Sequence, residues 1–217
     1  MTISGWNRER LAELGLSAEL IPPGIDLENF RPVELPRRDD VVLAVGRSLA
    51  LKNLGLTVEA WKSLEPRPEL WMFGVEPELG AEHGARYFER PSDERVNELF
   101  NEATVFVQTS IHEGFCLPAL EAMAAGTPVV STDAHCNRDF CRHEENCLIA
   151  ESEPEAVAAA IARLLADPAL RSRLAAAGFE TAAEYAWERR IKSVERFYLG
   201  LAEAGVTAPP RSAAPRG

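Results

Sequence analysis

The chain has 217 residues, of which 46% are hydrophobic and 26% charged, and its formal net charge is −11 at pH 7. This composition is ordinary for a globular protein with a sizeable core, and the acidic balance argues against nucleic acid or an anionic membrane as a partner. No apolar run reaches the roughly 18 residues of a membrane span, and the N-terminus lacks the apolar segment of a signal peptide. We therefore expect a cytoplasmic protein with reduced cysteines.

The N-terminal part of the chain is expected to form a short helix and then irregular chain. Residues 5–14 have helix signals at both ends, with Ser4 as candidate N-cap and Gly15 as candidate C-terminal glycine. Residues 24–32 show no periodicity and read as a linker. The proline-rich, charged stretch that follows marks a boundary near Pro36.

The next part of the chain alternates between strand and helix patterns. Short apolar runs are typical of strands buried on both faces of a sheet, and they occupy residues 41–45, 70–73, 86–88, 104–109, 128–131 and 146–150. Helical spacing occupies residues 54–64, 93–102, 118–125, 154–166, 168–185 and 187–204. This alternation predicts a three-layer, Rossmann-like α/β domain with a parallel sheet, in which ligands bind at the carboxyl ends of the strands.

The loop after the first strand carries two cations at such a strand end. Gly46 ends the strand, and Arg47 and Lys52 follow it, five residues apart. Two cations there suit a diphosphate through charge-assisted hydrogen bonds. The alternative is a solvated loop with two surface cations.

The block from Glu113 to Glu121 is the most specific feature of the chain. A glycine turn precedes Pro118, which is expected at the first helical position, and the free N–H groups of a helix start favour phosphate. Glu121 could accept hydrogen bonds from the vicinal hydroxyls of a ribose, at roughly 1.5–3 kcal/mol each, and Glu113 could contact a second sugar. The alternatives are a first-turn acid that complements the helix dipole and a surface acid in the loop.

Cysteines and histidines cluster in the second half of the chain. Zinc is one reading of this cluster, but the spacing lacks a Cys-x2-Cys pair, and cysteine is also a common buried residue. We therefore expect no metal at His135, Cys136, Cys141, His143 and Cys147, and we expect the three cysteines among them to be buried and structural.

Together these motifs resemble the C-terminal, donor-binding half of retaining GT-B glycosyltransferases of family 4 (glycosyl transferases group 1). The resemblance rests on the Glu-x7-Glu block with the Ala-Met-Ala-Ala-Gly-Thr-Pro-Val-Val that follows it, on the Gly-Arg…Lys-Asn loop, on a linker-like segment over 21–32, and on Ala186-Trp187-Glu188. It covers about residues 4–200. It implies an N-terminal-domain remnant and linker over 1–36, a nucleotide-sugar-binding domain over 37–186 and a crossover helix over 187–204. The composition of residues 205–217, rich in Pro, Ala and Ser, predicts a disordered tail.

The resemblance also implies roles for individual residues. Arg47, Lys52 and Glu113 would be the catalytic groups, with the two cations on the donor diphosphate and the carboxylate on the transferred sugar. Glu121 would hold the ribose, and the backbone near Arg90 would border the base. The full implied donor site is Gly46, Arg47, Lys52, Arg90, Glu113, Gly114, Phe115, Cys116, Leu117 and Glu121. No metal or other cofactor is expected, because cations and a helix dipole would stabilise the leaving diphosphate.

Three positions depart from the family pattern. Cys116 and Cys147 stand where the family usually has glycine, and residues 134–139 replace a typical Gly-Gly-Asn-Pro-Glu loop. The family also has two Rossmann-like domains, and this chain resembles the second alone. We therefore expect the chain alone to be inactive and to need an N-terminal acceptor domain in cis or in trans, which would also be the route to any peripheral membrane association.

The leading hypothesis is transfer of a hexose from a nucleotide-sugar donor to a glycan, lipid or small-molecule acceptor. The alternatives are a non-catalytic nucleotide-sugar-binding module and one subunit of a split glycosyltransferase. A sugar-nucleotide epimerase or a phosphorylase shares the two-domain architecture, but the Glu-x7-Glu block together with the Gly-Arg…Lys loop favours a transferase.

Overall fold

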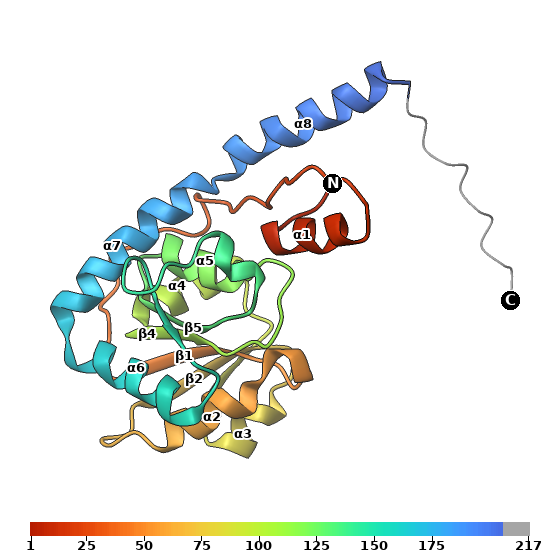
Figure 1. Ribbon diagram of the computed structural model, residues 1–217. Helices are drawn as coiled ribbons and strands as arrows, with labels where there is room; N and C mark the ends of the chain where they lie inside the picture. Colours follow the sequence, from red (N-terminus) through yellow and green to blue (C-terminus); the bar gives the residue numbers. More distant parts are fainter. Residues whose placement is uncertain (206–217) are drawn as a thin grey trace, which may run out of the picture.

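Six parallel strands in the order β3-β2-β1-β4-β5-β6 form the central sheet of the computed structural model, which describes residues 1–205 (Figure 1). The strands are β1 (Val41–Gly46), β2 (Glu69–Gly74), β3 (Arg86–Glu89), β4 (Val105–Gln108), β5 (Val129–Thr132) and β6 (Leu148–Ala150). All six expected strands are present, and their ends lie within one or two residues of the expected ones. The parallel sheet follows from their apolar runs, because helices cover both of its faces.

Helices pack on both faces of this sheet (Figure 1). On one side lie α4 (Asp93–Glu102), α5 (Leu117–Ala124) and α7 (Pro168–Glu184), and on the other α2 (Leu54–Lys62) and α6 (Pro154–Ala166). Phe100 and Phe106 anchor the first core, and Met72 and Ile161 anchor the second; all four side chains are fully buried. The three layers of the predicted fold are confirmed.

One helix was not expected from the sequence. The short helix α3 (Glu78–His83) lies beside β3, and only Leu79 and Gly80 of it are buried. A single turn and a half cannot show an apolar stripe. The available signals were Pro77 before the helix and Gly84 after it, whose φ of 70° is the left-handed conformation typical of a helix end.

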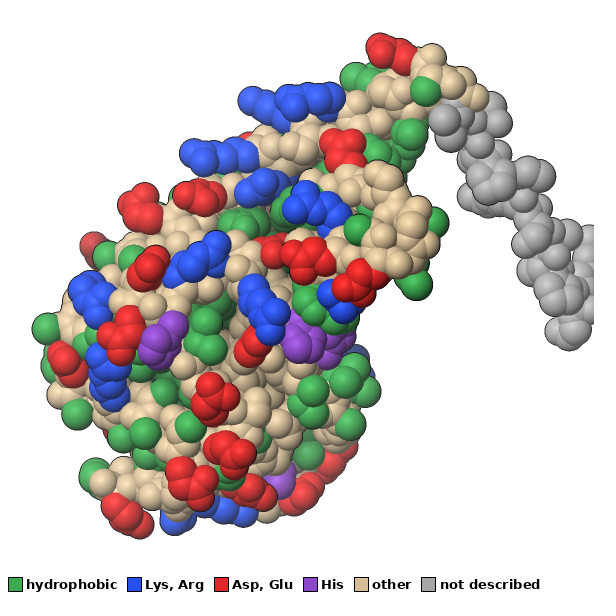
Figure 2. Space-filling model, viewed as in Figure 1, with side chains coloured by type: hydrophobic (Ala, Val, Ile, Leu, Met, Phe, Trp, Pro, Cys, Tyr) green, Lys and Arg blue, Asp and Glu red, His purple; other side chains and the backbone are tan. Residues whose placement is uncertain are grey.

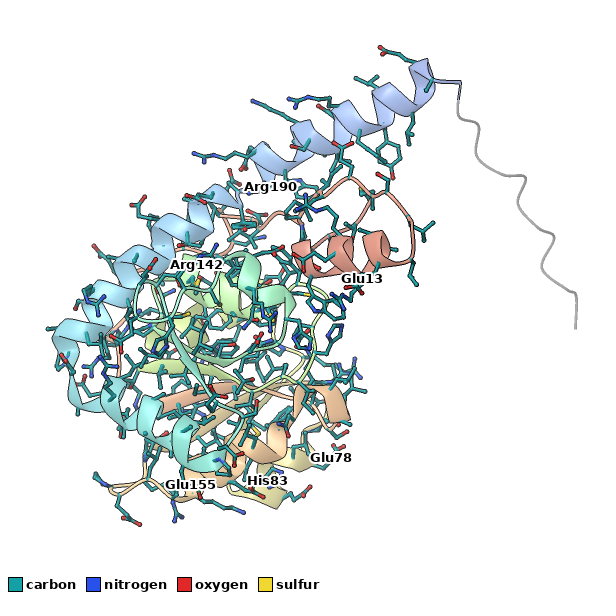
Figure 3. All side chains as sticks on the ribbon, in the orientation of Figure 1. Glu13, Glu78, His83, Arg142, Glu155 and Arg190 are labelled. Atoms are coloured by element: carbon teal, nitrogen blue, oxygen red, sulfur yellow. The ribbon has the colours of Figure 1, made fainter. Side chains whose placement is uncertain are left out.

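Two further helices flank the sheet domain. In α1 (Gly5–Glu13) the Ser4 side chain accepts a hydrogen bond from the Asn7 N–H, which confirms the expected cap. The last helix, α8 (Trp187–Glu203), extends away from the domain and buries no residue fully (Figure 1). Lys and Arg side chains gather along one edge of α8 (Figure 2). Arg190, in the first turn of this helix, lies on the other side of the sheet domain from His83 of α3 (Figure 3). The expected tail over 205–217 lies, apart from Gly205, outside the described residues.

None of the helices within residues 1–205 is both long enough and apolar enough to cross a bilayer.

The strand order places a crevice between β1 and β4. The chain builds β1, β2 and β3 outward in one direction, then crosses back through α4 to β4 on the other side of β1. The loops after β1 and β4 therefore leave in opposite directions, and in open α/β sheets ligands bind where they separate. In this chain these loops are 46–53 and 109–116, the two segments that carry the motifs.

Gly80, the glycine inside α3, gives a test of how α3 packs against Tyr87 of β3. A Cβ at Gly80 would lie 2.6 Å from the Tyr87 Cβ, whereas one at Gly55 in α2 would meet nothing within 4 Å. Alanine usually stabilises a helix by about 0.5–1 kcal/mol relative to glycine. We expect Gly55→Ala to stabilise by about that amount and Gly80→Ala to destabilise by about 1–3 kcal/mol, as measured by urea unfolding. Stabilisation by both would contradict the packing of α3 on Tyr87.

Candidate functional site

The loops after β1 and β4 are joined by hydrogen bonds at the strand switch point, which is the sheet edge where the two loops leave in opposite directions. The Ile111 N–H donates to the Leu51 carbonyl and the Thr109 hydroxyl donates to the Asn53 carbonyl, both at 2.9 Å. Asn53 adopts a left-handed conformation with φ 50° directly before α2. These contacts hold the segment with Arg47 and Lys52 against the segment with Glu113.

Lys52 and Glu113 form an ion pair across this junction. The Lys52 Nζ lies 2.6 Å from Glu113 Oε1, and the same oxygen accepts hydrogen bonds from Ser110 Oγ at 2.7 Å and Gln108 Nε2 at 3.0 Å. The two side chains are 24% and 12% exposed, so the pair is partly shielded from water. The sequence had placed both residues at this strand edge, and the structure brings them into contact.

Arg47 does not join this pair. Its Nε lies 2.9 Å from Oε1 of Glu76, which follows β2. The two cations of the loop thus pair with two different carboxylates. Sequence reasoning did not single out Glu76, although its place just beyond Gly74, at the carboxyl end of a strand, was an available signal.

The start of α5 offers free backbone N–H groups. The amides of residues 114–117 donate to no protein group within the described chain. Cys116 is the N-cap residue and has φ 72°, Leu117 is the first helical residue, and Pro118 is the second. The expected first position for Pro118 is therefore wrong by one residue. Free amides at a helix N-terminus attract anions, and at α5 they face the same strand edge as Lys52.

Cys116 occupies a backbone conformation that favours glycine. Its φ and ψ of 72° and 44° are left-handed, which costs roughly 1–2 kcal/mol for a residue with a side chain. Its side chain is 2% exposed. The thiol is thus accommodated in the core beneath the loop.

Glu121 lies on α5 without a partner. Its carboxylate takes part in no hydrogen bond or ion pair with any described residue, although the side chain is half-buried. Burial, and secondarily the charge of Asp93, raises the pKa of Glu121 to about 7. Glu121 lies beyond the first turn of α5, which contains no acid. The helix dipole acts mainly within the first turn, so the alternative role of Glu121, as an acid that complements this dipole, is disfavoured. A carboxylate with a displaced pKa in a crevice is a candidate binding group.

The loop between β3 and α4 borders Glu121. It contains Arg90, which is exposed, has φ 43° and donates its backbone N–H to the Gly74 carbonyl at 2.7 Å. The same loop leads into Asp93, whose charge acts on Glu121. The structure therefore places the backbone near Arg90 on the Glu121 side of the site, and brings Lys52 and Glu113 together at the β1–β4 junction.

The loop after β5 is attached to α1. His135 has φ 65° and ψ −61°, and the Cys136 N–H bonds back to the Ala134 carbonyl at 2.8 Å, which is the rare, strained γ-turn. The His135 ring stacks on Trp6 at 5.1 Å between centroids with planes 8° apart. Sequence reasoning did not single out Trp6, because this contact depends on how α1 docks.

The four cysteines are free and buried, as expected of structural cysteines. Within residues 1–205 no group of three or more His, Cys, Asp or Glu side chains has the arrangement of a metal site.

The displaced pKa of Glu121 gives a pH-dependent prediction. The folded protein holds a proton on Glu121 that the unfolded chain, with a pKa of 4.5, releases. Stability should therefore fall as pH rises from about 4.5 to about 7, by an amount on the order of 3 kcal/mol. Urea unfolding of the protein and of Glu121→Gln at pH 5 and pH 8 checks this. We expect the free energy of unfolding of Glu121→Gln, relative to that of the parent, to be higher at pH 8 than at pH 5. The same difference between variant and parent at both pH values would contradict the burial of an ionisable carboxyl.

This geometry defines a Rossmann-like α/β domain whose crevice at the strand switch point is lined by cations and free amides. The family model described as "Glycosyl transferases group 1" matches residues 26–181. The chain belongs to this family of glycosyltransferases.

Individual relatives agree with this assignment. A D-inositol 3-phosphate glycosyltransferase of Acidothermus cellulolyticus is 32% identical over 89% of this chain and 50% of its own length. The lipopolysaccharide core biosynthesis glycosyltransferase LpsE of Rhizobium meliloti is 33% identical over 69% of this chain and 46% of its own. The chain thus spans about half the length of the curated relatives it matches.

Solved structures share the fold. Sucrose-phosphate synthase from Thermosynechococcus elongatus superposes with a TM-score of 0.85 and 28% identity, covering 94% of this chain and 58% of the other. Anabaena HepE, solved in complex with UDP-glucose, has a TM-score of 0.80 at 16% identity, covering 92% of this chain and 63% of the other. The second likeness concerns the fold alone.

Proposed function

We propose that this chain is the donor-binding part of a retaining glycosyltransferase of family 4, which transfers a hexose from a nucleoside diphosphate sugar. The observation that carries the proposal is the convergence, at one strand edge, of the free amides of residues 114–117 with the cations of loop 46–53. Such a site binds an anion without any metal, because its charge and its N–H dipoles are already in place. The partners proposed for it are a glycan, lipid or small-molecule acceptor and an N-terminal acceptor domain, in cis or in trans.

The distribution of groups supports a nucleotide sugar over a bare phosphate. Glu121, on α5 one turn beyond the amides, could accept hydrogen bonds from two ribose hydroxyls, and those bonds would favour its ionised form. The loop at Arg90 lies on the same side and could border the base. Glu113 keeps Oε2 free of hydrogen bonds within the described chain and could meet the sugar. The similarly folded HepE was solved in complex with UDP-glucose, which is a ligand of the proposed class.

In the proposed reaction the diphosphate is the leaving group. The bond between the anomeric carbon and the diphosphate oxygen breaks, and negative charge develops on that oxygen. Lys52, Arg47 and the amides of α5 would stabilise this charge, and preorganised donors of this kind supply a large part of enzymatic rate enhancement. Glu113 would hold the sugar as the acceptor oxygen bonds to the anomeric carbon. The acceptor hydroxyl loses its proton in this step, and the departing diphosphate oxygen would take it.

Saturation-transfer NMR with UDP-glucose, GDP-mannose and ADP-glucose tests the proposal. We expect one of them to show saturation of base, ribose and hexose protons together, and the free diphosphate of the same nucleoside to displace it. Absence of saturation in all three, with the protein folded, would contradict a nucleotide-sugar site in this chain.

A further inference from the structure

Glu76 makes contacts that resemble those of a bound phosphate. Its Oε1 lies 2.9 Å from Arg47 Nε, and its Oε2 accepts the Ser48 backbone N–H at 3.0 Å. One carboxylate thus occupies a guanidinium and an adjacent loop amide. These are the two kinds of donor that an anion at a strand end uses, and both belong to the loop proposed to hold the diphosphate.

The contact with Arg47 is an ion pair and not a directed hydrogen bond. The Arg47 Nε is buried, yet its N–H meets no acceptor with hydrogen-bond geometry. The arginine side chain is 42% exposed and the glutamate 20%. The guanidinium can therefore exchange this carboxylate for another anion at small cost, because partly exposed ion pairs contribute only about 0.2–1 kcal/mol.

Tyr87 fixes the position of Glu76. The Tyr87 hydroxyl accepts the Glu76 N–H at 2.9 Å and donates to the Gly46 carbonyl at 2.8 Å. A Cβ at Gly46 would lie 2.5 Å from the tyrosine ring, and one at Gly74 would lie 2.7 Å from its hydroxyl. Gly46 and Gly74 thus make room for the Tyr87 side chain, which joins the β1 and β2 loops. The hydrogen bond from the Glu76 N–H to Tyr87 therefore holds the Glu76 backbone in place.

We propose that Glu76 is an internal counter-ion that competes with the donor diphosphate for Arg47 and Ser48 and thereby sets the affinity of the site. This inference rests on the proposed function. Binding of the donor would move the Glu76 side chain off the loop, while Tyr87 keeps its backbone in place. Glu76 would thus lower the affinity by occupying Arg47 and the Ser48 amide, which makes it a residue that determines affinity and not a catalytic one.

The test titrates the parent and its variants with UDP, GDP, ADP and inorganic pyrophosphate by calorimetry. Glu76→Gln keeps an oxygen for the Ser48 amide but removes the charge, and we expect roughly 3- to 10-fold tighter binding of diphosphates. Glu78→Gln makes the same charge change on α3, at the outer surface (Figure 3), and should leave affinity within about twofold. The double variant Arg47→Ala/Glu76→Gln is compared with Arg47→Ala alone.

The double variant separates competition from simple repulsion. If Glu76 acts by holding Arg47, most of the gain should disappear when Arg47 is alanine. An equal gain in both backgrounds, or no gain from Glu76→Gln, overturns the inference. Glu76→Asp, which is too short to reach Arg47 from the same backbone, should also bind diphosphate more tightly, and thermal unfolding checks that each variant is folded.

Titration with pyrophosphate distinguishes failure of the proposed function from failure of the inference about Glu76. If none of the nucleotides binds any of the proteins but pyrophosphate does, the proposed function fails and the inference is judged from the pyrophosphate ratios. If pyrophosphate also fails to bind, both are contradicted.

Discussion

Glu121→Ala should weaken the binding of the cognate nucleoside diphosphate by roughly ten- to a thousandfold, or about 1.5–4 kcal/mol. The reason is that a ribose offers two vicinal hydroxyls, and the Glu121 carboxylate has no protein partner within residues 1–205 that would compete for them. Hydrogen bonds to a charged acceptor are the strong ones. Calorimetric titration of the parent and the variant gives the difference directly.

Glu59→Ala provides the matched control for this variant. Glu59 is an exposed acid on α2, so Glu59→Ala makes the same substitution without touching the crevice. We expect affinity within about twofold of the parent, because surface charges contribute little. A similar loss in both variants, or no loss in Glu121→Ala, would mean that Glu121 does not hold the ribose.

The second large effect is expected at Arg47. Arg47→Ala should weaken the nucleoside diphosphate by about 30- to a thousandfold, the amount of one or two charged hydrogen bonds, and leave the bare nucleoside within about twofold. The reason is that the guanidinium, which pairs with Glu76 at 2.9 Å in the free protein, is no longer there to bind the phosphates.

Comparing ligands isolates the phosphate role of Arg47. The nucleoside, the monophosphate and the diphosphate are titrated in turn, and the loss should grow with each phosphate. Lys62→Ala, at an exposed cation on α2, controls for net charge. Equal losses for nucleoside and diphosphate would contradict contact between Arg47 and the phosphates.

The sequence was sufficient to predict the strands and most of the helices, because each of these elements shows its pattern within its own run of residues. Runs such as Val41–Val45 are apolar throughout, since both faces of a parallel strand are covered, and the helices between them keep the period of 3.6 residues. The helix α3 escaped prediction because six residues with two buried positions show no period. The Glu-x7-Glu block with the loop motifs was enough to predict glycosyl transferases group 1, and the family match confirms that family.

Only those contacts of the site that follow from the positions of the strand ends were predictable from the sequence. Lys52 and Glu113 follow neighbouring strands, so their meeting follows from topology. The pairing of Arg47 with Glu76 does not, because it depends on Tyr87 tying the β2 loop to Gly46. The stacking of Trp6 on His135 likewise depends on the docking of α1 on the β5 loop. Loop conformations set by distant side chains are not encoded in local spacing.

The most direct test of the donor site is calorimetric titration of the purified chain with UDP, GDP and ADP in the presence of a chelator. We expect saturable, one-to-one binding of one of the three, with a loss of that binding in Arg47→Ala. That result would also identify the base. Binding of none of them to the folded protein would contradict the central claim that the β1 and β4 loops of this chain form a nucleotide-sugar site.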